Sequence, residues 1–224
     1  MTRKLPNLQI LEINSLAVLE WHDEQRTPPL IERLRSSGLL RNPPIVSPLQ
    51  DGSGRYMVLD GTNRTSALRK MGLPHVIAQV AESDSPNLEL KTWNHVLWGQ
   101  KPDELINELK KIKDLKLQTS VENLASQWEN QALTWIQTAD GEAHTVKIQS
   151  HNLVSRVKML NKIVDSYKDR AKMDRTRAKN LEELRGLYKD LCAVVVFPPF
   201  EIADVIELCS QGNLMPAGIT RFTI

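Results

Sequence analysis

A six-residue turn, Asp60-Gly61-Thr62-Asn63-Arg64-Thr65, holds the residue types best suited to bind an anion. It follows the apolar run Tyr56–Leu59 and precedes a helical pattern, so we expect it to lie where a strand gives way to a helix. The free N–H groups and the dipole of a helix start favour a phosphate, and glycine lets the main chain approach it closely. Arg64 adds a guanidinium that can fork onto a phosphate.

The same turn also has a purely structural interpretation. Asp60 or Thr62 then caps the helix, and Arg64 forms a surface ion pair. Residue chemistry alone leaves both interpretations open. The turn is not a Walker loop, because GxxxxGK[ST] is absent. In the binding interpretation Thr62, Asn63 and Thr65 donate to the anion, while Asp60 holds a metal ion or orients a hydroxyl.

Three acidic residues crowd together before the first predicted helix, at Glu20, Asp23 and Glu24. Carboxylates that share a cleft raise one another's pKa, which suits a general base for a hydroxyl acceptor. The alternative is a solvated acidic loop. His22 and His95 can each contact a substrate, but the five histidines show no zinc-ligand spacing.

The C-terminal segment Pro216–Phe222 offers a site for a carboxylate. Arg221 can bind a carboxylate in bidentate fashion, and Thr220 adds a hydroxyl donor. Trp93 can form the wall of a small pocket. The structural alternatives are a surface arginine on a C-terminal strand and a tryptophan in the core.

These segments together resemble the ParB/sulfiredoxin superfamily, and most of all its free L-serine kinases. The strand–Asp-Gly-x-x-Arg–helix pattern at 60–64 is similar to the nucleotide-contacting signature of that superfamily. The Thr-Trp pair at 92–93 looks like the pair beside the serine pocket of the kinases, and residues 216–222 are very similar to their PAGxTRF segment. The order and spacing of these segments hold over roughly residues 8–98 and 190–224.

The resemblance implies an enzyme that transfers a phosphoryl group from ADP or ATP to the hydroxyl of free L-serine, giving O-phospho-L-serine. Glu20 is then the general base, and Asp60 a catalytic group and magnesium ligand. Asn42 joins the turn at 60–65 in contacting the nucleotide. The amino acid is expected to contact His22, Trp93, Thr220 and Arg221. The chain departs from the kinases at Leu19 and Asn63, where they usually have histidine.

A second hypothesis is a ParB-like, nucleotide-responsive regulator that binds DNA through the basic run at 168–179. We interpret that run first as a solvated helix face. The formal charge of +2, from 29 basic and 27 acidic residues, gives little support to a nucleic-acid binder. A third hypothesis is an interaction protein that kept the fold and lost turnover.

The two cysteines, Cys192 and Cys209, lie in apolar stretches, which favours buried, reduced thiols and a reducing compartment. The sequence shows no signal peptide and no apolar run of about 18 residues, so we expect a cytoplasmic protein without a membrane partner. Because it ends without a polar tail, we also expect the natural chain to continue.

The predicted fold class is α+β. A ParB/sulfiredoxin-like, nucleotide-binding N-terminal domain covers residues 1–99. A smaller mixed α/β C-terminal part at 100–224 completes the amino-acid pocket. The sequence patterns predict a helix at 30–37 that ends at Gly38, a hairpin turn at 51–54, a helix at 102–117, a hairpin that turns at 140–141, a strand at 192–197 and a helix at 201–209.

Overall fold

Two sheets carry most of the strands in the computed structural model, which describes residues 5–22, 24–82, 88–119, 132–150 and 152–224. The chain forms two compact units. The first contains Met1–Leu90, Glu201–Ala217 and Arg221–Ile224, and the second contains Lys91–Phe200 and Gly218–Thr220. The division at residue 99 into a nucleotide-binding domain and a C-terminal part stays a prediction.

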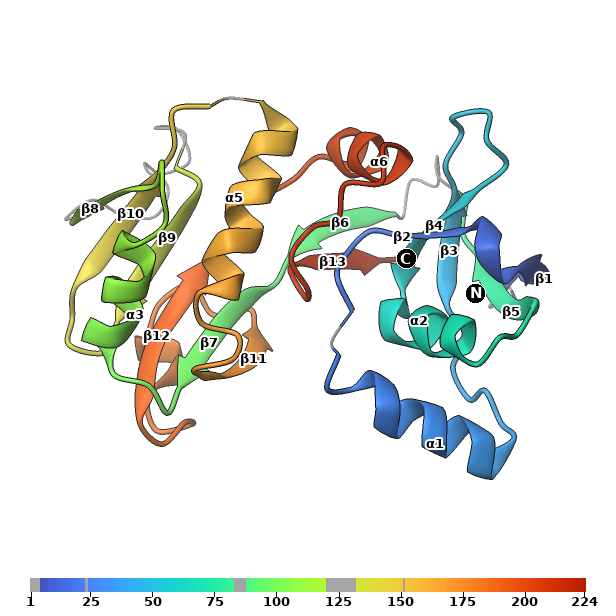
Figure 1. Cartoon of the computed structure of the whole chain (residues 1–224), viewed down its shortest axis with the longest axis horizontal. Coiled ribbons are helices and arrows are strands. Elements are labelled where there is room, and N and C mark those ends of the chain that lie inside the picture. The colour runs from blue at the N-terminus through green and yellow to red at the C-terminus, as the bar shows by residue number, and fades with distance from the viewer. Residues whose placement is uncertain (1–4, 23, 83–87, 120–131, 151) are drawn as a thin grey trace. The chain divides into compact units, whose positions relative to one another are not determined.

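The first unit is built on a five-stranded mixed sheet, in the order β1-β5-β3-β4-β2 (Figure 1). Neighbouring strands pair antiparallel for β1–β5 and β3–β4, and parallel for β3–β5 and β2–β4. The strands are β1 (Leu8–Glu12), β2 (Leu16–Val18), β3 (Ile45–Pro48), β4 (Tyr56–Asp60) and β5 (His75–Val80).

Three helices belong to the first unit: α1 (Thr27–Ser37), α2 (Thr62–Lys70) and α6 (Ile202–Ser210). A short 3-10 turn, η1 (Ile13–Ser15), joins β1 to β2. The core of the unit is the apolar cluster Leu11, Ile13, Leu16, Val46, Val58, Leu68, Val76 and Ala78. Burial of this cluster fixes the sheet against α2, because apolar side chains gain free energy when they leave water.

The second unit is built on a six-stranded antiparallel sheet, in the order β11-β7-β12-β9-β10-β8. Figure 1 shows α3 and α5 lying over one face of this sheet. A further pair of strands, β6 (Glu89–Thr92) and β13 (Thr220–Thr223), forms a two-stranded sheet. The elements of the second unit are β7 (Asn94–Trp98), α3 (Pro102–Lys110), β8 (Lys116–Thr119), β9 (Thr134–Thr138), β10 (Ala143–Lys147), α5 (Leu153–Asp165), β11 (Lys172–Thr176), η2 (Glu182–Leu184) and β12 (Leu191–Val196).

Several predicted elements are confirmed. The first helix ends at Gly38, whose φ of 63° is the left-handed conformation that favours glycine. The hairpin turn at 51–54 joins β3 to β4, and the turn at 140–141 joins β9 to β10. The strand at 192–197 and the helix at 201–209 are β12 and α6, each shifted by one residue.

Two interpretations are wrong. The helix predicted over 102–117 ends at Lys110, because residues 116–119 pair with β10 as strand β8. The basic run at 168–179 is not a helix face, because Lys172–Thr176 form strand β11, which pairs with β7. In both places pairing with a distant strand overrides the local helix propensity.

Both cysteines are buried, as predicted: Cys192 lies in β12 and Cys209 in α6. Burial raises the pKa of the Cys192 thiol to about 12 and that of Cys209 to about 11. In the part of the chain that the structure describes, no helix is long and apolar enough to cross a bilayer.

Candidate functional site

The turn at residues 60–65 has the geometry that the sequence predicted. Strand β4 ends at Asp60, Gly61 is the N-cap residue, and α2 begins at Thr62. Gly61 has φ 103° and ψ 26°, and no side chain caps the helix through a hydrogen bond. A Cβ atom at Gly61 would lie 3.1 Å from the Pro44 Cα and 3.1 Å from the Arg64 Nε. The position therefore requires glycine both for its backbone conformation and for space.

Arg64 joins the two ends of this turn to a second loop. Its guanidinium donates hydrogen bonds to the Asp60 carboxylate and to the Asn42 carbonyl oxygen. The Arg64 side chain is 20% exposed, whereas that of Asp60 is 64% exposed. The guanidinium is thus held in a fixed direction while the carboxylate faces solvent. The ion pair of the structural interpretation is present, and the anion-binding interpretation stays a prediction.

A cavity of about 830 Å³ opens beside this turn within the first unit. Its volume lies in the range of small-molecule and cofactor sites, roughly 300–1,000 Å³. Three arginines and one carboxylate give the cavity a positive balance, and an apolar wall stands beside them. It is lined by Gln25, Arg26, Pro29, Leu30, Arg33, Asn42, Pro43, Ile45, Asp60, Asn63, Arg64 and Gln79.

Four of the predicted nucleotide-contacting residues line this cavity: Asn42, Asp60, Asn63 and Arg64. Gly61, Thr62 and Thr65 are not among its lining residues, and Thr65 is fully buried. The N–H of Thr65 donates to the Gly61 carbonyl oxygen at 2.8 Å, as in a regular helix. The nucleotide-contacting roles of these residues remain predictions.

Helix α1 also contributes to the cavity, which was not predicted from the sequence. Arg26, Pro29, Leu30 and Arg33 line it, at spacings of three, four and seven residues. Residues with this spacing lie on one face of a helix, so the pattern was available in the sequence. It was not recognised, because cationic and apolar side chains alternate on that face. The apolar members suit the flat face of a base, and the arginines suit phosphates.

Glu20, the predicted base, lies in a segment that is fixed to the C-terminal part of the same unit. It forms a parallel β-bridge with Met215. The Trp21 N–H donates to the Met215 carbonyl oxygen at 3.0 Å, and the Met215 N–H donates to the Leu19 carbonyl oxygen at 2.8 Å. The Glu20 side chain is half-buried, and that of Leu19 is 1% exposed.

His22 extends this segment toward α2. Its Nε2 lies 3.3 Å from the Lys70 Nζ. Glu24 is exposed, and Asp23 lies outside the described residues. Glu20 and His22 thus belong to the unit that contains the cavity, as does Arg221, although none of these three lines the cavity itself.

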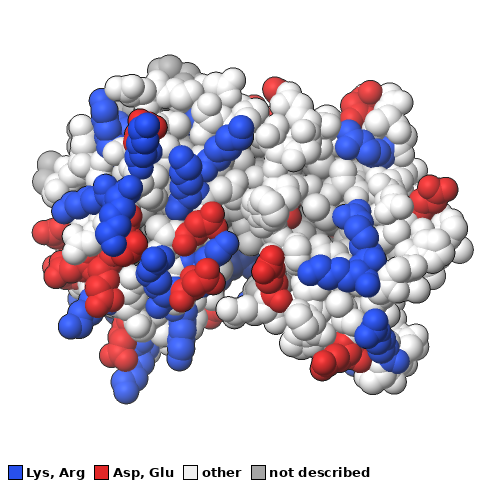
Figure 2. All heavy atoms as spheres, in the orientation of Figure 1, with Lys and Arg blue, Asp and Glu red and all other residues white. Residues whose placement is uncertain are grey.

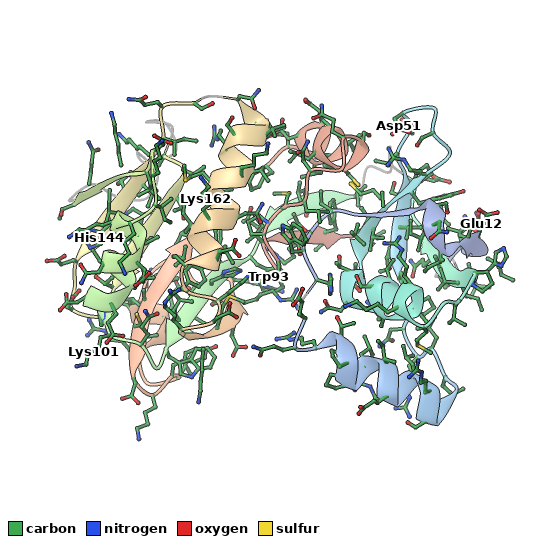
Figure 3. The ribbon with its side chains drawn as sticks, in the orientation of Figure 1. Glu12, Asp51, Trp93, Lys101, His144 and Lys162 are labelled. Atoms are coloured by element: carbon green, nitrogen blue, oxygen red, sulfur yellow. The ribbon has the colours of Figure 1, made fainter. Side chains whose placement is uncertain are left out.

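Trp93 and Thr220, the other predicted substrate contacts, belong to the second unit. Trp93, which Figure 3 labels, directly precedes β7. Its N–H donates to the carbonyl oxygen of Ile219, the residue before Thr220, at 2.9 Å. The structure therefore brings these two segments together, although they are far apart in the sequence.

The charges of the second unit are mixed rather than uniformly basic. On the face that Figure 2 shows, blue and red side chains are interspersed over this unit. Within the run at 168–179, Lys168 pairs with Asp165 at 2.7 Å, and Arg170 pairs with Glu108 at 3.5 Å. The predicted absence of DNA binding remains a prediction, and these ion pairs agree with it.

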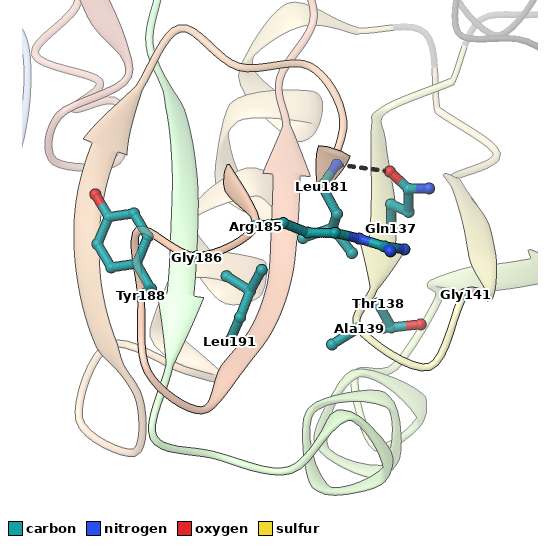
Figure 4. Close-up of a pocket in the computed structure, with 9 residues that line it drawn as sticks. All are labelled: Gln137, Thr138, Ala139, Gly141, Leu181, Arg185, Gly186, Tyr188 and Leu191. Atoms are coloured by element: carbon teal, nitrogen blue, oxygen red, sulfur yellow. Dashed lines mark hydrogen bonds between the residues drawn. The ribbon is translucent and has the colours of Figure 1, made fainter. Parts of the chain in front are cut away.

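A smaller cavity of about 230 Å³ lies in the second unit (Figure 4). Gln137, Leu181 and Arg185 stand on one side of it, and the Gln137 side-chain oxygen accepts a hydrogen bond from the Leu181 N–H at 3.0 Å. Arg185 is paired with Glu182 at 2.8 Å. None of the predicted site residues lines this cavity.

Asp60 fits the magnesium site that the sequence implies. Mg²⁺ in nucleotide sites is held by one or two carboxylates, with phosphate oxygens and water completing the octahedron. An exposed carboxylate that lines a cationic cavity meets this requirement. Within the described residues, no group of three or more His, Cys, Asp or Glu side chains could hold a metal ion by itself.

The described helices and strands define a protein of the α+β class, as the sequence predicted. No protein-family model matches the chain.

The particular proteins that this chain resembles are free L-serine kinases, which confirms the recognition made from the sequence. It is 31% identical over 102 residues to an ATP-dependent L-serine kinase of Staphylothermus marinus, a match that spans 46% of this chain and 40% of that protein. It is 22% identical over 227 residues to the ATP-dependent L-serine kinase SbnI of Staphylococcus aureus, covering 97% of this chain and 78% of that protein.

Solved structures of the same kind share the fold. A free serine kinase variant in complex with ADP superposes with a TM-score of 0.82 at 16% identity, covering all of this chain (100%) and 90% of the other. C-terminally truncated SbnI from Staphylococcus aureus gives a TM-score of 0.72 at 19% identity, covering 97% of this chain and 82% of the other.

Proposed function

We propose that the chain is a kinase of free L-serine that transfers a phosphoryl group from ATP to the serine hydroxyl, giving O-phospho-L-serine. The observation that carries the proposal is the 830 Å³ cavity beside the strand–Gly61–helix turn, which combines an apolar wall with three arginines. This combination matches a nucleotide, which has a flat base at one end and a chain of anionic phosphates at the other. The likeness to named serine kinases in sequence and fold supports the identity of the acceptor.

In this proposal the base packs between Pro29 and Leu30 of α1 and Pro43 and Ile45 near β3. The phosphates are bound by Arg26, Arg33 and Arg64 and by main-chain N–H groups at the start of α2. Arginine suits this task because its planar guanidinium can donate two parallel hydrogen bonds to one phosphate. Magnesium bound at Asp60 would neutralise charge on the phosphates.

Glu20 serves as the general base for the acceptor. Its carboxylate takes the proton of the serine hydroxyl as that oxygen bonds to the terminal phosphorus, and the bond from phosphorus to the bridging oxygen breaks to release ADP. The β-bridge to Met215 fixes the main chain of Glu20. His22, Trp93, Thr220 and Arg221 bind the amino acid, with Arg221 on its carboxylate.

ATP is proposed as the donor because both of the named relatives are ATP-dependent. The direct test is a phosphorylation assay with ATP and ADP against serine, threonine and homoserine. We expect O-phosphoserine to accumulate fastest with ATP and serine. A protein that binds nucleotide but phosphorylates none of the three amino acids would exclude the kinase function.

A matched pair of arginines on α1 tests the nucleotide cavity separately. Arg33 lines the cavity, whereas Arg35 is exposed on the same helix and does not line it. Arg33→Ala should weaken nucleotide binding by about tenfold to a hundredfold, as expected for a lost hydrogen bond to a charged group. Arg35→Ala should leave the affinity unchanged in the same calorimetric titration. Equal affinities in the two variants would place the nucleotide elsewhere.

A further inference from the structure

Two arginines of the second unit converge on the ring of Trp93. The guanidinium carbon of Arg175 lies 5.8 Å from the centroid of the indole, and that of Arg177 lies 5.6 Å from it. Strand pairing explains the arrangement: Arg175 pairs with His95 and Thr176 with Asn94, so the next position sets Arg177 opposite Trp93. Opposite and diagonal residues of neighbouring strands lie on the same face of a sheet.

Asp174, the acidic residue of β11, does not neutralise Arg175 and Arg177. Asp174 pairs with Val96, one position away from Arg175, so its side chain points to the other face of the sheet. There it shares a hydrogen bond with the hydroxyl of Tyr188. Within the described ranges, no ion pair joins either Arg175 or Arg177 to a carboxylate, and both side chains are exposed.

The segment that precedes Thr220 packs against the same cluster. Gly218 has φ 76°, and a Cβ atom there would lie 3.1 Å from the Arg175 Cδ. The Ile219 carbonyl oxygen accepts the hydrogen bond from the Trp93 N–H at 2.9 Å. The close approach at Gly218 thus keeps the stem of Arg175 against the main chain, and stacking on the half-buried indole restricts both guanidinium groups.

We infer that Arg175, Arg177 and Trp93 form a second anion site, which binds an oxyanion on the acceptor side of the reaction. Two like charges held near one aromatic ring repel each other, and a bound anion offsets that repulsion. Stacking lowers the rotamer entropy that each arginine loses on binding. The ligand chemistry is a carboxylate or a phosphate monoester, supplied by the α-carboxylate of the free amino acid or by the phosphate of its product.

This assignment rests on the proposed function for the identity of the ligand, but not for the existence of an anion site. It also gives the basic run at 168–179 a role that does not involve nucleic acid. The site differs from the nucleotide cavity in its residues, all of which belong to the second unit. Nucleotide affinity and oxyanion affinity can therefore be measured independently.

The test is calorimetric titration of the full chain with L-serine, O-phospho-L-serine, inorganic phosphate and ATP. The variants are Arg175→Gln, Arg177→Gln and the double substitution. Arg185→Gln is the matched control, because Arg185 is another exposed arginine of this unit, paired with Glu182. We expect the double variant to lose at least about tenfold in affinity for one or more of the three oxyanions, while its ATP affinity stays that of the parent.

The pattern of loss identifies the ligand. Loss for L-serine alone assigns the site to the carboxylate, and loss for O-phospho-L-serine and inorganic phosphate assigns it to the phosphate. If the parent binds none of the three, or the double variant and the Arg185→Gln control bind them all as the parent does, the anion site is refuted. If the parent phosphorylates serine but the arginine variants bind all three oxyanions as the parent does, the anion site is refuted and the proposed kinase function is not. Arginine-dependent phosphate binding by a parent without turnover refutes only the proposed kinase function.

Discussion

The two glycines that flank α2 allow the role of the 60–65 turn to be separated from the stability of the fold. Gly61 precedes the helix with φ 103°, and Gly72 follows it with φ 74°. A non-glycine residue in this region of backbone conformation costs about 1–2 kcal/mol. Alanine at either position should therefore lower the free energy of unfolding by a similar amount.

The two positions differ in what surrounds them. A Cβ atom at Gly72 meets nothing within 4 Å, whereas one at Gly61 lies 3.1 Å from the Arg64 guanidinium and from the Pro44 Cα. The methyl group of Gly61→Ala must therefore displace Arg64 or the backbone of the Pro44 loop. Either change shifts Arg64 by a few tenths of an ångström relative to its hydrogen-bond partners Asp60 and Asn42.

We expect Gly61→Ala to weaken ATP binding by about tenfold to a hundredfold, which corresponds to the roughly 1.5–3 kcal/mol of a hydrogen bond to a charged group. Gly72→Ala should bind ATP as the parent does, after correction for the folded fraction. Urea unfolding gives the stability of each variant, and calorimetric titration gives the affinity. Parental affinity in Gly61→Ala, or an equal loss in Gly72→Ala, would refute the assignment of this turn to the phosphates.

Three other predictions concern single side chains. Glu20→Gln should lower kcat by about 10²–10⁴ with little change in serine or ATP binding, because the amide fills the same space but takes no proton. Glu24→Gln is the control. An equal loss of kcat in both variants would contradict the assignment of Glu20 as the base. Hydrogen bonds from Ser53 hold the pKa of Asp51 well below its usual range. The ionised carboxylate therefore stabilises the fold at pH values above the ordinary pKa of an aspartate. This contribution is lost as the pH falls through the lowered pKa. In Asp51→Asn, the free energy of unfolding should therefore fall less steeply as the pH is lowered, as measured by urea unfolding at a series of acidic pH values. An unchanged pH dependence would show that Asp51 does not contribute to acid destabilisation. Burial raises the pKa of the Cys192 thiol to about 12, so iodoacetamide at pH 8 should label it only after unfolding; labelling of the folded protein at the rate of a free thiol would be inconsistent with its burial.

The parts of the fold that could be predicted from the sequence are those that local signals determine. The end of α1 follows from Gly38, which supplies the left-handed residue that closes a helix. The turn between β9 and β10 follows from Asp140-Gly141, where Gly141 has φ 95°. These residues impose their conformation through their own backbone preferences, whatever the rest of the chain does.

The parts that could not be predicted depend on distant partners. Strand β8 exists because Leu117 pairs with Val146, and this pairing ends a helical pattern that continues in the sequence. Strand β11 exists because residues 172–176 pair with β7, which precedes them by more than seventy residues. A run rich in lysine and arginine suits a helix surface as well as an edge strand, so its composition does not choose between them.

The candidate site shows the same division. The Asp60–Arg64 turn could be predicted because a strand, a glycine and a helix start are all local features. The arginines of α1 could not be assigned to the cavity from their spacing alone, since spacing gives a helix face but not what that face contacts.

The β-bridge between Glu20 and Met215 is a feature of the candidate site that depends on a distant partner. Met215 directly precedes the Pro216–Phe222 segment, so the bridge fixes the predicted base beside the start of the predicted amino-acid-binding segment, within one unit. No local signal places residues 20 and 215 together. The resemblance to serine kinases does link them, because it assigns the base and the amino-acid ligands to one reaction. Leu19 and Met215, whose main chains make the contact, are both almost fully buried, so apolar packing holds the main chain of Glu20 next to Met215.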